Sequence, residues 1–240
     1  MYAIETNNLV KKFKEKTAVN GISLKINEGE LFALLGTNGA GKTTTIKMLS
    51  TLILPTSGDI KILGLDIIKD KQNIKELLNV SPQETAIAPN LSVKENLEFM
   101  AGVYQIKNKE EKINELVKIF KLEEVLNQKA KTLSGGWQRK VSIAISLINN
   151  PKILFLDEPT LGLDVIARKE LWNVINKLKG KITIILTTHY MEEAESLSDR
   201  IGIMSKGNLV DVGTSKQLIE KTKEKNFEDA FVKIATGGVE

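Results

Sequence analysis

The sequence predicts an α/β fold with a largely parallel sheet, an antiparallel patch of strands and an inserted helical segment. Two observations carry this prediction. Apolar strand patterns alternate with helical stripes in the early and late parts of the chain, as in a parallel sheet with helical crossovers. Between them, residues from about 84 to 150 have a mostly helical pattern. The 240 residues suffice for one substantial domain with a full core.

The first part of the chain is expected to form strands up to a glycine-rich loop. Ile22–Ile26 alternates apolar and polar side chains, as a half-buried strand does. Leu31–Leu35 is continuously apolar, which is typical of a strand covered on both faces. Lys42–Leu52 has a helical pattern, Pro55 ends it, and Asp59–Leu63 resumes as a strand.

The inserted segment is expected to be helical because its apolar residues recur at helical spacing. Ser92-Val-Lys-Glu95 matches a capping box that begins a helix extending to about Tyr104. Stripes from Ile113 to Phe120 and from Val141 to Ile148 indicate faces packed into the core.

The last third returns to strands and helices. Ile153–Leu156 and Ile182–Leu186 are expected to be buried strands with a helix between them, on which Trp172 packs. Ile201–Met204 and Leu209–Val212 flank Lys-Gly-Asn, a hairpin turn that we assign to the antiparallel patch. Short helices follow.

The composition excludes several classes of protein. The net charge of +4 comes from 34 basic and 30 acidic residues that are interspersed, so a nucleic-acid-binding patch is not expected. There is no cysteine, which rules out disulfides and cysteine-based metal sites. Neither a secretory signal nor a membrane span is expected, because no apolar run is long enough.

A glycine-rich loop follows the buried strand 31–35 and matches the pattern G-x-x-x-x-G-K-T. Its glycines allow backbone N–H groups to surround phosphate oxygens, and the next helix directs its positive end at the anion. Lys42 supplies a charge to the β- and γ-phosphates, and Thr43 a hydroxyl to Mg²⁺. The predicted ATP-binding residues here are Gly36, Thr37, Asn38, Gly39, Ala40, Gly41, Lys42, Thr43 and Thr44.

Two carboxylates end the strand 153–156. With a phosphate-binding loop in the same chain, Asp157 is expected to help hold Mg²⁺. Glu158 lies one residue further and is expected to act as the general base on the attacking water. His189 follows another buried strand, at the end where ligands of parallel sheets gather.

These motifs resemble those of the ATP-binding-cassette (ABC) ATPases over nearly the whole chain. Leu133-Ser-Gly-Gly-Trp137 is similar to the family's signature motif, with tryptophan where glutamine is common. Asp157 to Asp164 is similar to the Walker B end and D-loop. The resemblance places Gln83 at the Q-loop, His189 at the switch histidine, and Phe13 at the aromatic that stacks on adenine.

The resemblance implies a P-loop NTPase (RecA-like) core at about 1–83 and 151–213, a helical subdomain at about 84–150, and C-terminal helices at about 214–236. Hydrolysis would use Glu158 and His189, and Mg²⁺ would be held by Thr43, Gln83 and Asp157.

Family members close head to tail around two ATP molecules. Ser134, Gly135 and Gly136 would then contact the ATP of a second chain, with Ser134 capping the helix that follows, and Asp164 would contact across the interface.

The resemblance is to separate ATPase subunits of bacterial multidrug or ABC-2-type transporters. It implies a second ATP-binding subunit, identical or different, and a transmembrane permease that exports drugs or other small molecules. The chain would lie in the cytoplasm on the inner face of the cell membrane. Two alternatives remain open: a soluble ABC ATPase that acts on ribosomes or DNA, and a non-catalytic regulatory cassette. A kinase is less favoured, because no acceptor site is suggested.

Overall fold

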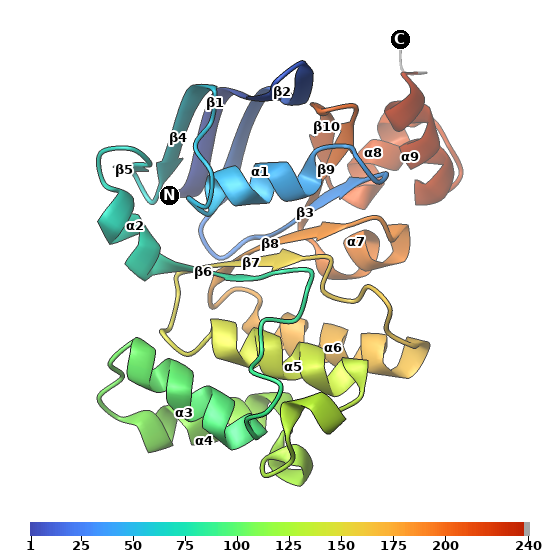
Figure 1. Ribbon diagram of the computed structural model, residues 1–240. Helices are drawn as coiled ribbons and strands as arrows, with labels where there is room; N and C mark the ends of the chain where they lie inside the picture. Colours follow the sequence, from blue (N-terminus) through green and yellow to red (C-terminus); the bar gives the residue numbers. More distant parts are fainter. Residues whose placement is uncertain (238–240) are drawn as a thin grey trace.

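A six-stranded sheet lies at the centre of the computed structural model, which describes residues 1–237 (Figure 1). The strands lie in the order β10-β9-β3-β8-β7-β6, and every neighbouring pair is parallel except β9 and β10. Their bounds are β3 Leu31–Gly36, β6 Leu78–Ser81, β7 Ile153–Asp157, β8 Thr183–Thr188, β9 Arg200–Ser205 and β10 Asn208–Gly213. The predicted α/β fold with a largely parallel sheet is therefore confirmed.

A second sheet is antiparallel, with the order β2-β1-β4-β5. Its strands are β1 Tyr2–Phe13, β2 Lys16–Asn27, β4 Ser57–Ile62 and β5 Leu65–Asp66. The hairpin predicted around residue 207 does not belong to this sheet: β9 pairs in parallel with β3, so the hairpin extends the central sheet instead.

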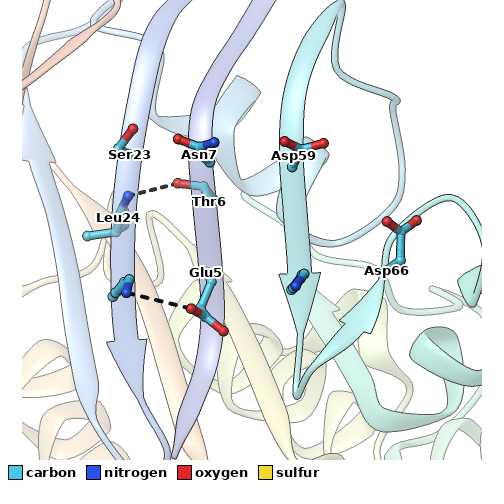
Figure 2. Close-up of a pocket in the computed structure, with 9 residues that line it drawn as sticks. Glu5, Thr6, Asn7, Ser23, Leu24, Asp59 and Asp66 are labelled. Atoms are coloured by element: carbon cyan, nitrogen blue, oxygen red, sulfur yellow. Dashed lines mark hydrogen bonds and ion pairs between the residues drawn. The ribbon is translucent and has the colours of Figure 1, made fainter.

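The outer face of the antiparallel sheet is polar and forms a shallow hollow of about 630 Å³ (Figure 2). Glu5 on β1 lies 3.8 Å from Lys25 Nζ on β2, and Asn7, Ser23 and Asp59 lie on the same face. Alternating polar and apolar side chains along these strands leave one face in solvent and turn the other toward the core.

Helices cover both faces of the central sheet and form a layer beyond it (Figure 1). The helices are α1 Lys42–Leu49, α2 Lys71–Leu77, α3 Val93–Val103, α4 Lys109–Phe120, α5 Gly135–Ser146, α6 Val165–Leu178, α7 Met191–Leu197, α8 Ser215–Thr222 and α9 Phe227–Thr236. Short 3₁₀ turns lie at Glu123–Val125 and Ala130–Thr132. Helix α1 is shorter than predicted, because Thr51 adopts a φ of 63°. Helix α2 and strand β6 were not predicted.

The capping box that was predicted at the start of α3 is present. Glu95 N donates to Ser92 Oγ at 3.2 Å, and Ser92 N donates to Glu95 Oε2 at 2.7 Å. The backbone hydrogen bond from Ser92 lowers the pKa of the Glu95 carboxyl. This cap fixes where the helical segment begins after the loop that contains Gln83.

The continuous apolar run of β3 separates two cores. Leu31, Ala33 and Leu35 face the core shared with α3 to α6, whereas Phe32 and Leu34 face the core beneath the antiparallel sheet and α1. All five side chains are fully buried. A strand buried on both faces has no polar side, and this explains the sequence pattern.

The strand order brings the predicted motifs to one edge. Strands β3, β8, β7 and β6 are consecutive neighbours and parallel, so their C-terminal ends lie side by side. β3 leads into the glycine-rich loop, β8 into His189, β7 into Glu158, and β6 into Gln83. Ligands of parallel sheets bind at this edge.

Candidate active site

The glycine-rich loop curls around the N-terminus of α1. Gly39 and Gly41 have φ angles of 82° and 102°, in the left-handed region that favours glycine. A Cβ on Gly41 would meet the carbonyl oxygen of Ala18 at 2.5 Å. Among residues 1–237, the amides of Gly39 and Gly41 donate to no backbone or side-chain oxygen. These amides and the helix terminus together form an anion-binding cradle.

Lys42 is the cation of this cradle. Its side chain is 5% exposed, and Nζ donates to the carbonyl oxygens of Gly36 at 2.7 Å and Thr37 at 3.3 Å. Glu158 Oε1 lies 3.3 Å from the same nitrogen. The ammonium is thus held at the centre of the loop by oxygens, where phosphate oxygens are the natural partners of a lysine.

Asp157 is held by two hydroxyl groups. Thr43 Oγ1 donates to Asp157 Oδ1 at 3.1 Å, and Thr187 Oγ1 donates to the same oxygen at 2.5 Å. The carboxylate is buried. Thr187 was not predicted as a site residue; it also accepts a hydrogen bond from Glu158 N at 3.0 Å. Thr187, on the neighbouring strand, therefore orients both acids. The only sequence signal for this role is its position directly before Thr188 and His189.

Glu158 and His189 form a close pair next to the glycine-rich loop. His189 Nδ1 lies 2.6 Å from Glu158 Oε2. Glu158 is 6% exposed and has a φ of 50°, a left-handed conformation that non-glycine residues rarely adopt. Its backbone N–H also donates to the carbonyl oxygen of Thr187 at 3.1 Å. The backbone turn and the histidine together direct the carboxylate toward Lys42.

A polar cavity of about 380 Å³ is lined by both the glycine-rich loop with Lys42 and the Glu158–His189 pair. Its volume falls in the range of small-molecule sites. The lining residues are Lys16, Ala18, Asn38, Gly39, Ala40, Gly41, Lys42, Thr43, Thr44, Gln83, Glu158, Leu161 and His189. Lys16 and Ala18 were not predicted because they belong to no motif, and Leu161 was not predicted as a site residue although it lies within the Asp157–Asp164 motif.

Gln83 reaches this cavity from the loop after β6, and Arg139 of α5 fixes that loop. Arg139 Nη1 donates to the carbonyl oxygen of Pro82 at 2.6 Å, and Nη2 donates to that of Gln83. The Arg139 side chain is buried, and burial lowers the pKa of its guanidinium. Arg139 was not predicted either, because its partners are backbone atoms far away in sequence.

The signature segment does not line this cavity. Ser134 and Gly135 are exposed at the N-terminus of α5. Ser134 occupies the N-cap position, but its side chain accepts no capping hydrogen bond, so the predicted capping role is wrong. A Cβ on Gly136 would approach Ala167 Cβ to 3.0 Å, which explains a glycine where α5 and α6 meet.

Five further predicted residues also lie outside the cavity lining: Phe13, Gly36, Thr37, Asp157 and Asp164. Phe13 ends β1, is 48% exposed, and has Lys11 Nζ 5.1 Å from its ring centre. Asp164 caps α6, since its Oδ1 accepts from the amides of Ile166 at 2.8 Å and Ala167 at 2.9 Å. The structure therefore gives Asp164 a local structural role.

This fold and this site define a P-loop nucleoside triphosphatase. A phosphate cradle, a buried lysine, a hydroxyl–carboxylate pair and a Glu–His pair meet at the C-terminal edge of a parallel sheet.

Comparison with known proteins names the family. The model of the ABC transporter family matches residues 19–161, and the chain belongs to this family. The human protein named phospholipid-transporting ATPase ABCA3 is 43% identical over 87% of this chain, which spans 12% of that relative. The linearmycin resistance ATP-binding protein LnrL of Bacillus subtilis (strain 168) is 36% identical over 98% of this chain and 76% of its own length.

Solved structures agree. The ATP-binding subunit of an ABC transporter superimposes with a TM-score of 0.86 at 27% identity, over 97% of this chain and 99% of that one. The cassette MJ0796, a dimer in a post-hydrolysis state bound to ADP and Pi, gives a TM-score of 0.78 at 27% identity, over 88% and 98%. The chain is thus an ATP-binding, ATP-hydrolysing cassette of an ABC transporter. Within residues 1–237, no helix is long and apolar enough to cross a membrane.

Proposed function

We propose that this cassette binds ATP with Mg²⁺ in the cavity beside the glycine-rich loop and hydrolyses it with Glu158 and His189. The observation that carries the proposal is the convergence of Lys42, Asp157 and Glu158 at one end of the sheet. The oxygens of Thr43, Gln83 and Asp157 suit Mg²⁺, which prefers oxygen ligands and is bound by one or two carboxylates together with phosphates. Mg²⁺ neutralises charge on the β- and γ-phosphate oxygens when it is bound.

Each of these residues then has its own role in ATP hydrolysis. The loop amides and Lys42 Nζ bind the phosphates and stabilise negative charge as the γ-phosphoryl group leaves. Glu158 accepts a proton from the attacking water, for which its carboxylate is directed into the cavity. His189 holds Glu158 Oε2 at 2.6 Å and limits the orientations of that carboxylate. Phe13 is proposed to stack on adenine.

A second cassette completes the site in this proposal. Ser134 is the N-cap of a helix of twelve residues that Gly135 and Gly136 begin, and none of the three lines the cavity of its own chain. An exposed helix N-terminus favours an anion, and the γ-phosphate of a second chain's ATP is the proposed occupant. The dimeric post-hydrolysis structure of MJ0796 supports this arrangement. Asp164 is proposed to contact the partner across the interface while it caps α6.

The dimer is proposed to drive a separate transmembrane permease. Exposed apolar side chains on α3, Phe99 and Val103, lie on the helix that follows the Gln83 loop and suit a permease segment. The name of LnrL, a linearmycin resistance protein, supports export of drugs or other small molecules. The chain is then placed in the cytoplasm, on the inner face of the cell membrane.

Steady-state ATPase activity and ATP-dependent dimerisation test this function. We expect Mg²⁺-dependent turnover by the wild-type chain. We expect the Glu158→Gln variant to shift from monomer to dimer in size exclusion when ATP and Mg²⁺ are added. Stimulation of turnover by DNA or ribosomes would favour a soluble nucleic-acid-associated ATPase instead. Absence of turnover by the wild-type chain with ATP and Mg²⁺ would favour a regulatory cassette.

A further inference from the structure

A buried carboxyl behind the active site has no part in the mechanism above. Glu193 lies on α7, four residues after His189, and its side chain is fully buried. Trp172 Nε1 donates to Glu193 Oε1 at 3.0 Å. The hydroxyls of Thr160 and Thr188 lie beside the carboxyl and lower its pKa, but Thr160 Oγ1 and Glu193 Oε2 have no hydrogen-bond partner in the described part of the chain.

These three neighbours come from three different segments. Thr160 lies two residues after Glu158, in the segment that continues into the D-loop. Trp172 lies on α6, the helix that Asp164 caps. Thr188 immediately precedes His189, and its Oγ1 accepts from Tyr190 N at 2.9 Å. One carboxyl therefore touches elements that lead to Glu158, the D-loop and His189.

The surroundings of Glu193 favour its neutral form. Burial raises the pKa of the carboxyl, and the charge of Glu158 acts in the same direction. The hydroxyls of Thr188 and Thr160 and the indole N–H of Trp172 oppose this rise, and the charge of Glu193 in turn raises the pKa of the buried Arg139 guanidinium. A protonated carboxyl supplies an acceptor for the indole N–H and a donor for the threonine hydroxyls.

We propose that Glu193 is a positioning residue that holds His189 in place by tying the end of β8 to α6 and to the segment after Glu158. The proposal rests on the proposed role of His189. It follows that, within one chain, a movement of α6 or of the D-loop displaces His189 through the Trp172–Glu193 hydrogen bond. Glu193 itself touches no substrate.

The test compares three substitutions at the buried site and one control. Glu193→Gln keeps the shape and both hydrogen-bonding functions, whereas Glu193→Leu keeps the volume and removes them. Trp172→Phe removes the indole N–H together with part of the volume of the ring, and it keeps an aromatic side chain at this position. Glu192→Leu changes an exposed acid on the same helix and is the control. Each variant is assayed for the kcat and KM of ATP hydrolysis, with its fold checked by circular dichroism and thermal unfolding.

We expect Glu193→Leu to lower kcat about tenfold with KM changed by less than about twofold, since a small misplacement of a catalytic group has effects of this order or larger. Trp172→Phe should act in the same direction but less, and it serves as the test if Glu193→Leu does not fold. Glu193→Gln and Glu192→Leu should stay within about twofold of wild type.

Combination with His189→Ala shows whether the effect passes through the histidine. If Glu193 acts through His189, Glu193→Leu should add no further loss of kcat in the His189→Ala background. Additive losses, or a Glu193→Gln variant as impaired as Glu193→Leu, would overturn the positioning role. A His189→Ala variant with wild-type kcat would instead show that the proposed role of His189 is wrong.

Discussion

His189 Nδ1 lies 2.6 Å from Glu158 Oε2, so two residues that directly follow neighbouring parallel strands meet at the C-terminal edge of the sheet. The other carboxylate oxygen of Glu158 lies 3.3 Å from Lys42 Nζ. The glutamate is therefore held between a ring nitrogen and an ammonium, and its main chain is fixed by Thr187. Its orientation depends on three strands at once.

Replacing Lys42 by Ala should abolish ATP turnover. Within residues 1–237, the Lys42 ammonium and the His189 ring are the only basic groups within 4 Å of Glu158, and the ammonium lies inside the phosphate cradle. We expect a loss of kcat of at least about a hundredfold, since charge stabilisation in such sites contributes at this level. Phosphate release measured under saturating ATP and Mg²⁺ checks this.

Lys216→Ala is the matched control for the lysine, because Lys216 is exposed on α8, far along the chain from the loop. It should keep wild-type turnover. Undiminished activity of the Lys42 variant would contradict the assignment of the phosphate loop.

Replacing Glu158 by Gln should trap an ATP-bound dimer. The amide keeps the shape of the side chain but accepts no proton from water, so ATP persists between two cassettes. Size exclusion with ATP and Mg²⁺ should show roughly twice the monomer mass. A variant that stays monomeric would remove the main support for the two-cassette site.

Adding Gly135→Asp to the Glu158→Gln variant tests the signature segment. Gly135 is exposed, and a Cβ there meets no atom within 4 Å, so the change should not disturb the monomer. A carboxylate at this helix N-terminus repels the phosphate of a partner's ATP. We expect the dimer to disappear while each monomer still binds a fluorescent ATP analogue.

Replacing Phe13 by Ala should weaken ATP binding without changing the chemical step. Loss of stacking on a base is worth roughly 1–3 kcal/mol, so KM should rise about tenfold and kcat should stay near wild type. Phe99→Ala is the control, since that ring is also exposed, at 60%, but lies on α3. Equal KM values for the two variants would show that Phe13 does not contact adenine.

Features encoded by neighbouring residues could be predicted from the sequence. The phosphate loop, the acids at 157 and 158, and the capping box at Ser92 each occupy a few consecutive positions with a fixed chemical pattern. The buried strands were equally visible, because Leu31–Gly36 is apolar on both faces. Such signals need no knowledge of which strands pair.

Features that depend on pairing could not be predicted. Thr187 orients Asp157 only because β8 lies beside β7, and Arg139 holds the Gln83 loop across 56 residues of sequence. The hairpin was assigned to the wrong sheet for the same reason. It belongs to the central sheet because β9 pairs with β3 in parallel, and no local sequence pattern shows that pairing. Ser134 has the right residue type for a cap, but its side chain does not accept the bond.

Replacing Arg139 by Met should loosen the Gln83 loop. The variant keeps an apolar stem but leaves the carbonyl oxygens of Pro82 and Gln83 without their donors. These two hydrogen bonds are partly buried, and a hydrogen bond to a charged group contributes about 1.5–3 kcal/mol, so we expect a loss of roughly 3 kcal/mol in the free energy of unfolding by urea, together with a lower kcat. Lys94→Met, which removes an exposed pair with Glu98, should change stability by less than about 0.5 kcal/mol.

Replacing Glu193 by Gln should make the protein less sensitive to rising pH. Because burial raises the pKa of Glu193 in the folded chain above its usual value, the native state keeps a proton that the unfolded chain has lost. The wild type therefore loses stability as pH rises from the unfolded toward the folded pKa, by up to about 1.4 kcal/mol per pH unit. The Gln variant has no proton to lose there.

The difference in the free energy of unfolding between Glu193→Gln and wild type isolates this one group, because all other carboxyls titrate in both proteins. Urea unfolding at several pH values from about 5 to 8 should show the difference growing with pH and levelling off above the folded pKa. A difference that is constant over this range would mean that Glu193 ionises as readily in the folded as in the unfolded chain. The carboxyl would then be held as an anion in the folded chain, where its charge interacts with that of Arg139.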